Sequence, residues 1–437
     1  MSSITAVGWR TVTQSSPPPD ADALAPLVVR TTLVEDPGPL LALLPREEPT
    51  AAWVRRGDGL VAWGRAATCH SDGPDRFARA RAWWSDVART AVVRDEAGVY
   101  GSGLVCFGSF AFADEPGDSM LVVPEVVVGR RGETCWVTTI GVGAIPAAPP
   151  LTATPAPEEP EGIAFADGAL SGTEWETVVA EAVRRINDGA LEKVVLARDL
   201  QVTADRDLDV RWPLTRLAAS YPMCWTFHVD GLFGATPEML VRRERGLVTS
   251  RVLAGTIRRT GNDARDLALA ATLARSSKDL EEHEYAVRSV ADALRRHCSS
   301  MNVPEAPFVL HLPNVMHLAT DVAGVVHDTG DPEATSLDLA ASLHPSAAVG
   351  GTPTDVATEL IAEIEGMDRG RYAGPVGWMD TSGDGEWGLA LRSAELDGAR
   401  VRLFAGCGIV ADSDPEAELA EAQAKFVPVR DSLARAH

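Results

Sequence analysis

The sequence predicts an α+β fold in which antiparallel β-sheets form a sandwich-like core and helices pack outside it. Several apolar runs have the length of strands and are joined by turn residues. Between residues 192 and 255 they leave no room for helical crossovers, so neighbouring strands should be antiparallel. Hydrophobic residues make up 45% of the chain and charged residues 23%, a balance typical of folded globular proteins. No P-loop and no GxGxxG motif occurs, so a nucleotide-binding sheet is not indicated.

A proline-rich connector divides the chain unequally. Residues 146–160 contain six prolines, which can neither pair in a sheet nor continue a helix. Before the connector, residues 1–150 form a strand-rich part with one helix expected at about residues 74–90. Residues 163–437 form the second part, and we expect the two parts to pack as one compact unit.

Three helices are predicted after the connector. Ser171 and Glu174 form a capping-box pattern, and apolar residues at helical spacing follow until Gly189. The second helix should run from about residue 277 to 297 and the third from about 414 to 433. Each is opened by Ser or Asp in a capping position.

Strands are predicted between these helices, and the Asp397-Gly398 pair is typical of a hairpin turn. The runs are EKVVLARDLQV (192–202), MCWTFHVDG (223–231), EMLVRRE (238–244), LVTSRVLAG (247–255), YAGPVGWMD (372–380), GEWGLALRSAEL (385–396) and ARVRLFAGCGIV (399–410).

The net charge of −22 restricts the partners of the chain. A field of this sign repels nucleic acid and anionic membrane surfaces, so neither is expected to bind. An anionic substrate would need a local divalent cation or buried Arg and Lys side chains. The six cysteines have no metal-ligand spacing, and the first residues do not form a signal peptide. We therefore expect a cytoplasmic location.

Two acidic pairs are candidates for a metal site. Asp279 and Glu282, and likewise Glu418 and Glu421, are spaced i,i+3 near the start of a predicted helix, so each pair shares one helix face. Carboxylates at helix starts are also favoured by the helix dipole alone, without any functional role. If the two faces meet, their repulsion would require a cation, and an all-oxygen site suits Mg²⁺.

Other candidates have equally simple structural explanations. Lys193 opens the apolar strand KVVLA: such lysines usually reach solvent, but one held in the interior could act as a general base. Lys425 is spaced to form an i,i+4 salt bridge with Glu421. Glu238 follows a Gly/Pro turn, where a surface position is common, and His317 by itself would be a packed core histidine.

Nine sequence blocks, in a fixed order over some 250 residues, favour functional roles for these candidates when they are considered together. They are KVVLAR (193–198), FGATPEML (233–240), LAGTIRR (253–259), SSKDLEEHE (276–284), HLATDV (317–322), SLHPSAAVGGTP (342–353), GRYAGPVGW (370–378), LALRSAEL (389–396) and RLFAGCGIV (402–410). In these blocks the chain resembles the chorismate-binding enzymes, which include isochorismate, salicylate and anthranilate synthases. The resemblance of residues 1–150 is weak.

The resemblance implies roles for particular residues. Glu282 and Glu421 match glutamates that bind Mg²⁺, which holds the ring carboxylate of chorismate, and Asp279 and Glu418 match positions that reach the metal through water. Another group is implied to contact the substrate. Its members are Arg392 and Tyr372 at the enolpyruvyl carboxylate, Lys425 and Gly408 near the ring carboxylate, and Thr256 and His317 along the site.

The resemblance also narrows the reaction. Water-using members carry Lys at the position of Lys193, and the aminodeoxychorismate type carries Lys in place of Ala254. The implied reaction is an SN2″ isomerisation of chorismate to isochorismate, with Lys193 as base towards water and Glu238 as acid towards the C4 hydroxyl. The product would feed menaquinone or siderophore biosynthesis. No glutaminase subunit is expected, and we expect a monomer.

Two alternatives stay open. A salicylate synthase shares the first step and then expels pyruvate; Tyr372 leaves this reading available, while the SLHPSAAVGGTP, HLATDV and VGW stretches look more like isochorismate synthases. A non-catalytic chorismate-binding regulator is the alternative from another class. Binding alone needs neither an acid nor a base, so the joint presence of Lys193, Glu238, Glu282 and Glu421 argues against it.

Overall fold

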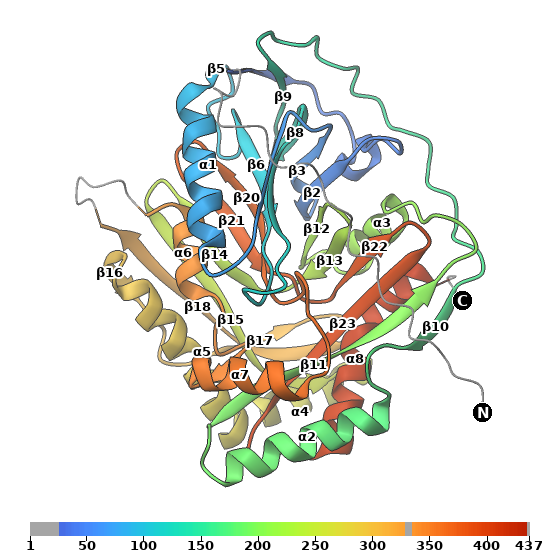
Figure 1. Ribbon diagram of the computed structural model, residues 1–437, viewed down its shortest axis with the longest axis vertical. Helices are drawn as coiled ribbons and strands as arrows, with labels where there is room; N and C mark the ends of the chain where they lie inside the picture. Colours follow the sequence, from blue (N-terminus) through green and yellow to red (C-terminus); the bar gives the residue numbers. More distant parts are fainter. Residues whose placement is uncertain (1–25, 328–333, 435–437) are drawn as a thin grey trace.

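Two large β-sheets form the centre of the molecule. The structure, a computed structural model, describes residues 26–327 and 334–434 (Figure 1). Within these residues one sheet, sheet A, has thirteen strands and the other, sheet B, has ten. Neighbouring strands are antiparallel except for one parallel pair, β1 with β5. The predicted α+β fold with antiparallel sheets is confirmed.

Sheet A combines strands from both sides of the proline-rich connector. In order across the sheet it contains β10 (Ala164–Asp167), β11 (Lys193–Thr203), β23 (Arg400–Ile409), β22 (Ser393–Asp397), β13 (Leu232–Thr236), β12 (Trp225–Val229), β2 (Thr50–Arg55), β3 (Asp58–Trp63), β8 (Val126–Arg131), β9 (Thr134–Val142), β1 (Leu27–Val34) and β5 (Val92–Asp95), with β19 (Gly351–Thr352) beside β11.

Sheet B is built in the same mixed way. It contains, in order, β16 (Cys298–Asn302), β18 (Val315–Val326), β15 (Leu247–Arg258), β14 (Met239–Glu244), β21 (Gly385–Leu389), β20 (Pro375–Asp380), β6 (Val105–Ser109), β7 (Ser119–Val123) and β4 (Ala67–Ser71), with β17 (Phe308–His311) beside β18. Buried residues of both sheets form one large apolar core, in which Trp53, Phe107, Phe227, Trp378 and Trp387 are among the largest side chains. A small separate cluster lies between α4 and β18.

Helices cover the outer faces of the sheets (Figure 1). Those packed on sheet A are α2 (Gly172–Asn187), α3 (Arg211–Ser220), α7 (Thr354–Ile364) and α8 (Pro415–Leu433). Those packed on sheet B are α1 (Arg76–Thr90), α4 (Asp263–Leu273), α5 (Ser277–Arg295) and α6 (Ser336–Leu343), and a short 3-10 helix, η1, spans Leu40–Leu43. None of the helices in the described residues is long and apolar enough to cross a membrane.

The four predicted helices are present, but one expectation about the strands is wrong. Ser171 and Glu174 form the predicted capping box, and Ser276 and Asp414 cap α5 and α8. However, α3 lies between β11 and β12, where no helix was expected. The helix buries Leu214 and Leu217. Pro213 falls in its first turn, where a missing backbone N–H costs no hydrogen bond, so this proline does not exclude a helix.

The division of the chain at residue 150 stays a prediction. Strands from both sides of the connector are paired directly: Val54 of β2 lies opposite Thr226 of β12, and Phe107 of β6 lies opposite Trp378 of β20. The connector itself has no regular secondary structure between residues 146 and 160.

Candidate active site

One cavity of about 210 Å³ lies between the two sheets and the helices α5 and α8. All twelve residues singled out from the sequence line it. They are Lys193, Glu238, Thr256, Asp279, Glu282, His317, Tyr372, Arg392, Gly408, Glu418, Glu421 and Lys425. The structure therefore brings together side chains that lie more than 200 positions apart in the chain, although this placement alone does not give any of them a role.

Lys193 enters the cavity from the first residue of β11. Its side chain is only 2% exposed, and its Nζ lies 2.9 Å from Glu282 Oε1. Burial follows from its position in a strand whose next residues, Val194 and Val195, are also buried. The alternative of a solvent-exposed lysine at a strand edge is therefore wrong.

Glu238 reaches the cavity from the turn between β13 and β14. It is 6% exposed, and its backbone N–H donates to Thr236 Oγ1 over 3.2 Å. Burial raises the pKa of Glu238 to about 8, although the nearby positive charge of Lys193 opposes this shift. The surface position considered from the sequence is wrong. The raised pKa agrees with a carboxyl group that can donate a proton at neutral pH.

Arg392, His317 and Thr256 form a chain of polar contacts. The Nη2 of Arg392 lies 3.4 Å from Nε2 of His317, and the Nδ1 of His317 lies 3.1 Å from Thr256 Oγ1. Burial lowers the pKa of His317 well below its ordinary value, and the charge of Arg392 lowers it further. The imidazole is therefore neutral, and His317 Nε2 accepts from the guanidinium.

Arg392 also carries a buried donor with no partner. Its Nη1 has no hydrogen bond to any described residue. The backbone of Arg392 adopts a φ of 50°, and Ala373, which also lines the cavity, adopts 62°. Left-handed conformations of non-glycine residues are strained and cluster at functional sites. A cavity that holds an orphaned guanidinium donor suits an anionic ligand, because a carboxylate satisfies such a donor well.

Tyr372 and Lys425 complete the polar lining. The Tyr372 ring stacks on Phe404 with a centroid separation of 5.0 Å, and burial raises the pKa of Tyr372 to about 12, so the phenol stays protonated. Lys425 Nζ donates to the carbonyl oxygen of Gly406 over 2.8 Å and lies 2.7 Å from Glu421 Oε1. The i,i+4 salt bridge considered from the sequence is present, inside the cavity.

The two acidic helix faces meet at this cavity. Asp279 and Glu282 come from α5, and Glu418 and Glu421 from α8. Ser413 holds Glu418 in place, because its hydroxyl donates to Glu418 Oε1 over 2.8 Å. A Cβ added at Gly408 would lie 2.7 Å from Glu282 Oε1, so this glycine keeps space open beside that carboxylate.

These donors fit Mg²⁺. Across residues 26–327 and 334–434, no three His, Cys, Asp or Glu side chains form a ready-made metal cluster. Mg²⁺ does not need one, since it usually keeps several waters and takes one or two protein carboxylates. Glu282 and Glu421, with the space beside Gly408, provide oxygen donors of that kind.

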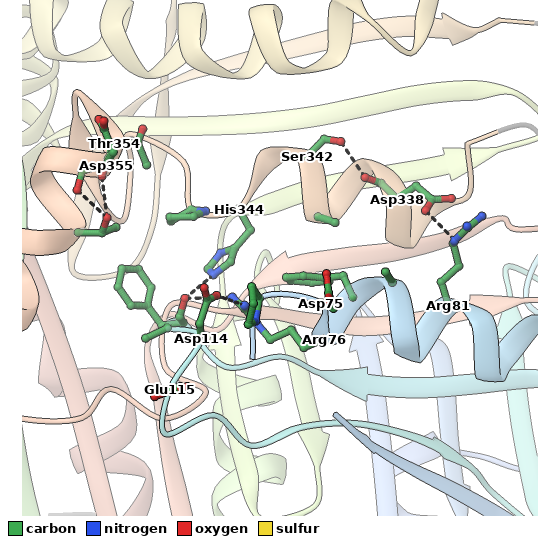
Figure 2. Close-up of a pocket in the computed structure, with 18 of the residues that line it drawn as sticks. Asp75, Arg76, Arg81, Asp114, Glu115, Asp338, Ser342, His344, Thr354 and Asp355 are labelled. Carbon is green, nitrogen blue, oxygen red and sulfur yellow. Dashed lines mark hydrogen bonds and ion pairs between the residues drawn. The ribbon is translucent and has the colours of Figure 1, made fainter. Parts of the chain in front are cut away.

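A larger pocket of about 1390 Å³ contains none of the twelve residues. It lies among α1, α6, α7 and the loop around Asp114 (Figure 2). Arg76 pairs there with Asp114, and Arg81 with Asp338. His344 Nε2 donates to the carbonyl oxygen of Phe112 over 3.0 Å, and burial lowers the pKa of His344 to about 4. His344 is thus a packed, hydrogen-bonded histidine.

The sequence reasoning missed other residues of the candidate active site. Ala348, Val349 and Phe404 line the cavity, and Arg369 borders both pockets. Arg369 pairs with Glu365 four residues earlier, across the C-terminal end of α7. The i,i+4 spacing was a possible signal, but α7 itself was not predicted.

Comparison with known proteins agrees with this site. A family model described as chorismate binding enzyme matches residues 36–144 and 150–434. Isochorismate synthase DhbC of Bacillus subtilis (strain 168) is 41% identical over 264 residues, which cover 58% of this chain and 66% of that relative. A third of that relative thus lies outside the match. The salicylate biosynthesis isochorismate synthase of Pseudomonas aeruginosa is 34% identical over 417 residues, covering 89% of this chain and 85% of the relative.

The fold gives the same answer. The solved structure of DhbC from Bacillus anthracis superimposes with a TM-score of 0.75 and 32% sequence identity, covering 90% of this chain and 98% of that one. The resemblance drawn from the sequence blocks is confirmed, and it extends over residues before the connector, where the sequence signal was weak. The relatives from Bacillus subtilis and Pseudomonas aeruginosa are named isochorismate synthases, and the chain belongs to the chorismate-binding enzyme family.

Proposed function

We propose that the chain is an isochorismate synthase that converts chorismate to isochorismate. The observation that carries the proposal is the joint burial, in one cavity, of Lys193, Glu238 and the orphaned Nη1 of Arg392. A base, an acid and an anion-binding donor are the three functions that this reaction needs. The names of the relatives support the same activity.

The chemistry exchanges one hydroxyl for another. Lys193, in its neutral form, accepts a proton from the water whose oxygen bonds to C2 of the ring. The ring double bonds shift, and the C4–O bond breaks while Glu238 donates its proton to the departing hydroxyl. One water enters and one leaves, so the reaction is an isomerisation. The proton on Lys193 then returns to Glu238 through solvent.

The rest of the cavity would bind and orient a dicarboxylate. Arg392 has a free donor for the enolpyruvyl carboxylate, and neutral His317 keeps the guanidinium aimed by accepting from its other terminal nitrogen. Tyr372 and Thr256 would add hydroxyl donors, and Lys425 with the backbone at Gly408 would face the ring carboxylate. When bound, Mg²⁺ would supply positive charge beside that ring carboxylate. Glu282 and Glu421 would hold the ion, with Asp279 and Glu418 next to them.

The test is product analysis with labelled water. The pure protein is incubated with chorismate and Mg²⁺ in H₂¹⁸O. The products are then separated, and their molecular masses are measured by mass spectrometry. Isochorismate with one ¹⁸O at the C2 hydroxyl is expected, without ammonia or a second subunit. If chorismate persists unchanged, the chain does not catalyse this reaction, and the regulatory alternative gains support.

Salicylate synthesis is the second candidate, because Tyr372 leaves it available. It shares the first step, after which isochorismate loses pyruvate and becomes salicylate. The C2 hydrogen must then align with the side-chain methylene, which is a matter of near-attack geometry. Salicylate and pyruvate formed as fast as chorismate disappears would move the assignment while leaving the base and acid roles unchanged. Three points stay predictions: that the product feeds menaquinone or siderophore synthesis, that the chain is a monomer, and that it is located in the cytoplasm.

A further inference from the structure

The edge of β11 beside the cavity lacks a strand partner for part of its length. On its other edge β11 pairs with β23 from Val194 to Thr203. On this edge β19 pairs only with Lys193 and Val194, and β10 joins again only at Leu200. The backbone groups of Val195 and Ala197 that point to this edge are buried, so they need other partners.

Two of these groups have other partners: the N–H of Val195 donates to the carbonyl oxygen of Gly350 over 2.8 Å, and Trp175 Nε1 donates to the carbonyl oxygen of Ala197 over 3.0 Å. Arg369 and Glu365 satisfy the remaining two groups with side chains. Arg369 Nη2 donates to the carbonyl oxygen of Val195 over 2.7 Å, and the backbone N–H of Ala197 donates to Glu365 Oε2 over 2.8 Å. The two side chains are joined by two hydrogen bonds, Nε to Oε1 at 2.7 Å and Nη2 to Oε2 at 2.6 Å. Arg369 is 3% exposed and Glu365 only 1%.

The same guanidinium also fixes a second wall of the cavity. Arg369 Nη1 donates to the carbonyl oxygen of Val349 over 2.9 Å. Val349 and Ala348 line the cavity, and so does Val195. Since side chains two residues apart in a strand share a face, Val195 and Lys193 point to the same side of β11. One buried ion pair therefore ties the strand that carries Lys193 to the loop that faces it.

We propose that the buried Arg369–Glu365 pair is a positioning unit of the active site, which holds Lys193 where it can accept a proton from the attacking water. The proposal rests on the isochorismate synthase function proposed above. A buried ion pair usually adds little net stability over apolar side chains of the same size, so its directional hydrogen bonds are its main contribution here. Lysine cannot replace arginine, because one ammonium cannot reproduce a bidentate carboxylate contact together with two carbonyl contacts.

The test compares Arg369→Lys with Arg243→Lys. Arg243 is a matched control: it is buried, pairs with Asp384 and donates to the carbonyl oxygen of Ser382 over 3.1 Å, but it does not line the cavity. Arg369→Lys should lower kcat by about 10-fold to 100-fold with KM changed by less than about threefold, since small misplacements of reacting groups cost rates of this size. Arg243→Lys should lower the melting temperature by a similar amount and keep kcat within about twofold of the wild-type value.

A readout without substrate separates this proposal from the proposed function. Amide hydrogen exchange of the full chain should quicken at residues 193–199 and 345–351 in Arg369→Lys, and not in Arg243→Lys. Unchanged exchange at those segments, or equal kcat losses in both variants, would overturn the positioning role. An inactive wild-type protein with the expected exchange pattern would overturn only the proposed function. If Arg369→Lys does not fold, the double change Arg369→Met with Glu365→Leu removes both charges and takes its place.

Discussion

Lys193 Nζ lies 2.9 Å from Glu282 Oε1, so the proposed base and a proposed metal ligand form one buried ion pair. An ammonium held by a carboxylate cannot accept a proton from water. The proposed reaction therefore requires Lys193 to give up its proton before the attack on C2. Because the two side chains are in contact, a change at one removes the ion-pair partner of the other. Their roles are therefore separated by the quantity that changes, kcat for a base and Mg²⁺ dependence for a metal ligand.

Lys193→Ala should lower kcat by about 10²-fold to 10⁴-fold and leave the dissociation constant of chorismate nearly unchanged, as expected for loss of a general base. Steady-state kinetics and calorimetric binding measure the two quantities. Lys193→Arg should not restore activity, since a guanidinium stays protonated. A rise in KM alone, with kcat intact, would make Lys193 a binding residue instead.

Activity should require Mg²⁺ and disappear with EDTA. Glu282→Gln and Glu421→Gln should each raise the Mg²⁺ concentration for half-maximal activity by at least about 10-fold. Glu363→Gln is the control, because Glu363 is an exposed residue of α7 that pairs with Arg185 and lies outside the cavity. Wild-type Mg²⁺ dependence in either cavity variant would exclude that carboxylate as a ligand.

Glu238 should impose an alkaline limit on the rate. Its pKa, raised to about 8 by burial, lies above the ordinary value of 4.5, so the protonated acid is available at pH 7 and is lost as pH rises through about 8. The stability that comes from keeping this group neutral is complete below about pH 4.5, declines as pH rises, and is lost above about pH 8. Glu238→Gln should lower kcat by about 10²-fold or more. Between pH 6 and pH 9 its free energy of unfolding should also decrease less than that of the wild type. An unchanged alkaline limb in that variant would assign the limb to another group.

Gly408→Ala should disable the site while the fold survives. The added Cβ would lie 2.7 Å from Glu282 Oε1 and 3.1 Å from Lys193 Cε, so both side chains would have to move. The strand conformation at Gly408 does not require glycine, because its φ is not in the left-handed range. We expect kcat to fall at least about 10-fold, a cost typical of misplaced reacting groups, with little change in melting temperature. Full activity of Gly408→Ala would mean that Lys193 and Glu282 need not keep these positions.

Local patterns in the sequence were enough to predict much of the fold. The capping residues Ser171, Ser276 and Asp414 begin α2, α5 and α8, because each side chain satisfies a backbone N–H in the first turn of its helix. The helices that were not predicted, such as α7, are short, and their stability comes from packing against the sheets. No window of sequence contains that information.

Residues of the site could be predicted where they lie in sequence motifs. They could not be predicted where only packing in the folded chain brings them to the cavity. Lys193 and Glu238 each had a simple solvent-exposed interpretation, and the burial that contradicts it comes from strands and helices far away in the chain. The raised pKa of Glu238 depends on the same distant packing. Burial is its largest cause, and the neighbouring charges of Lys193, Lys425 and Arg392 act in the opposite direction. Arg369 was missed because its partners are backbone carbonyls, which leave no pattern in a sequence.

The direct pairing of β2 with β12 and of β6 with β20 bears on any attempt to shorten the protein. A fragment of residues 163–437 would keep every candidate catalytic side chain, yet it would expose the bare edges of β12 and β20 in what are now the interiors of two sheets. Exposed apolar edges of this kind recruit strands from other molecules. Such a fragment should therefore aggregate on expression. The proline-rich connector is therefore not a suitable point for truncation, because the residues before it belong to the two sheets that carry the candidate catalytic side chains.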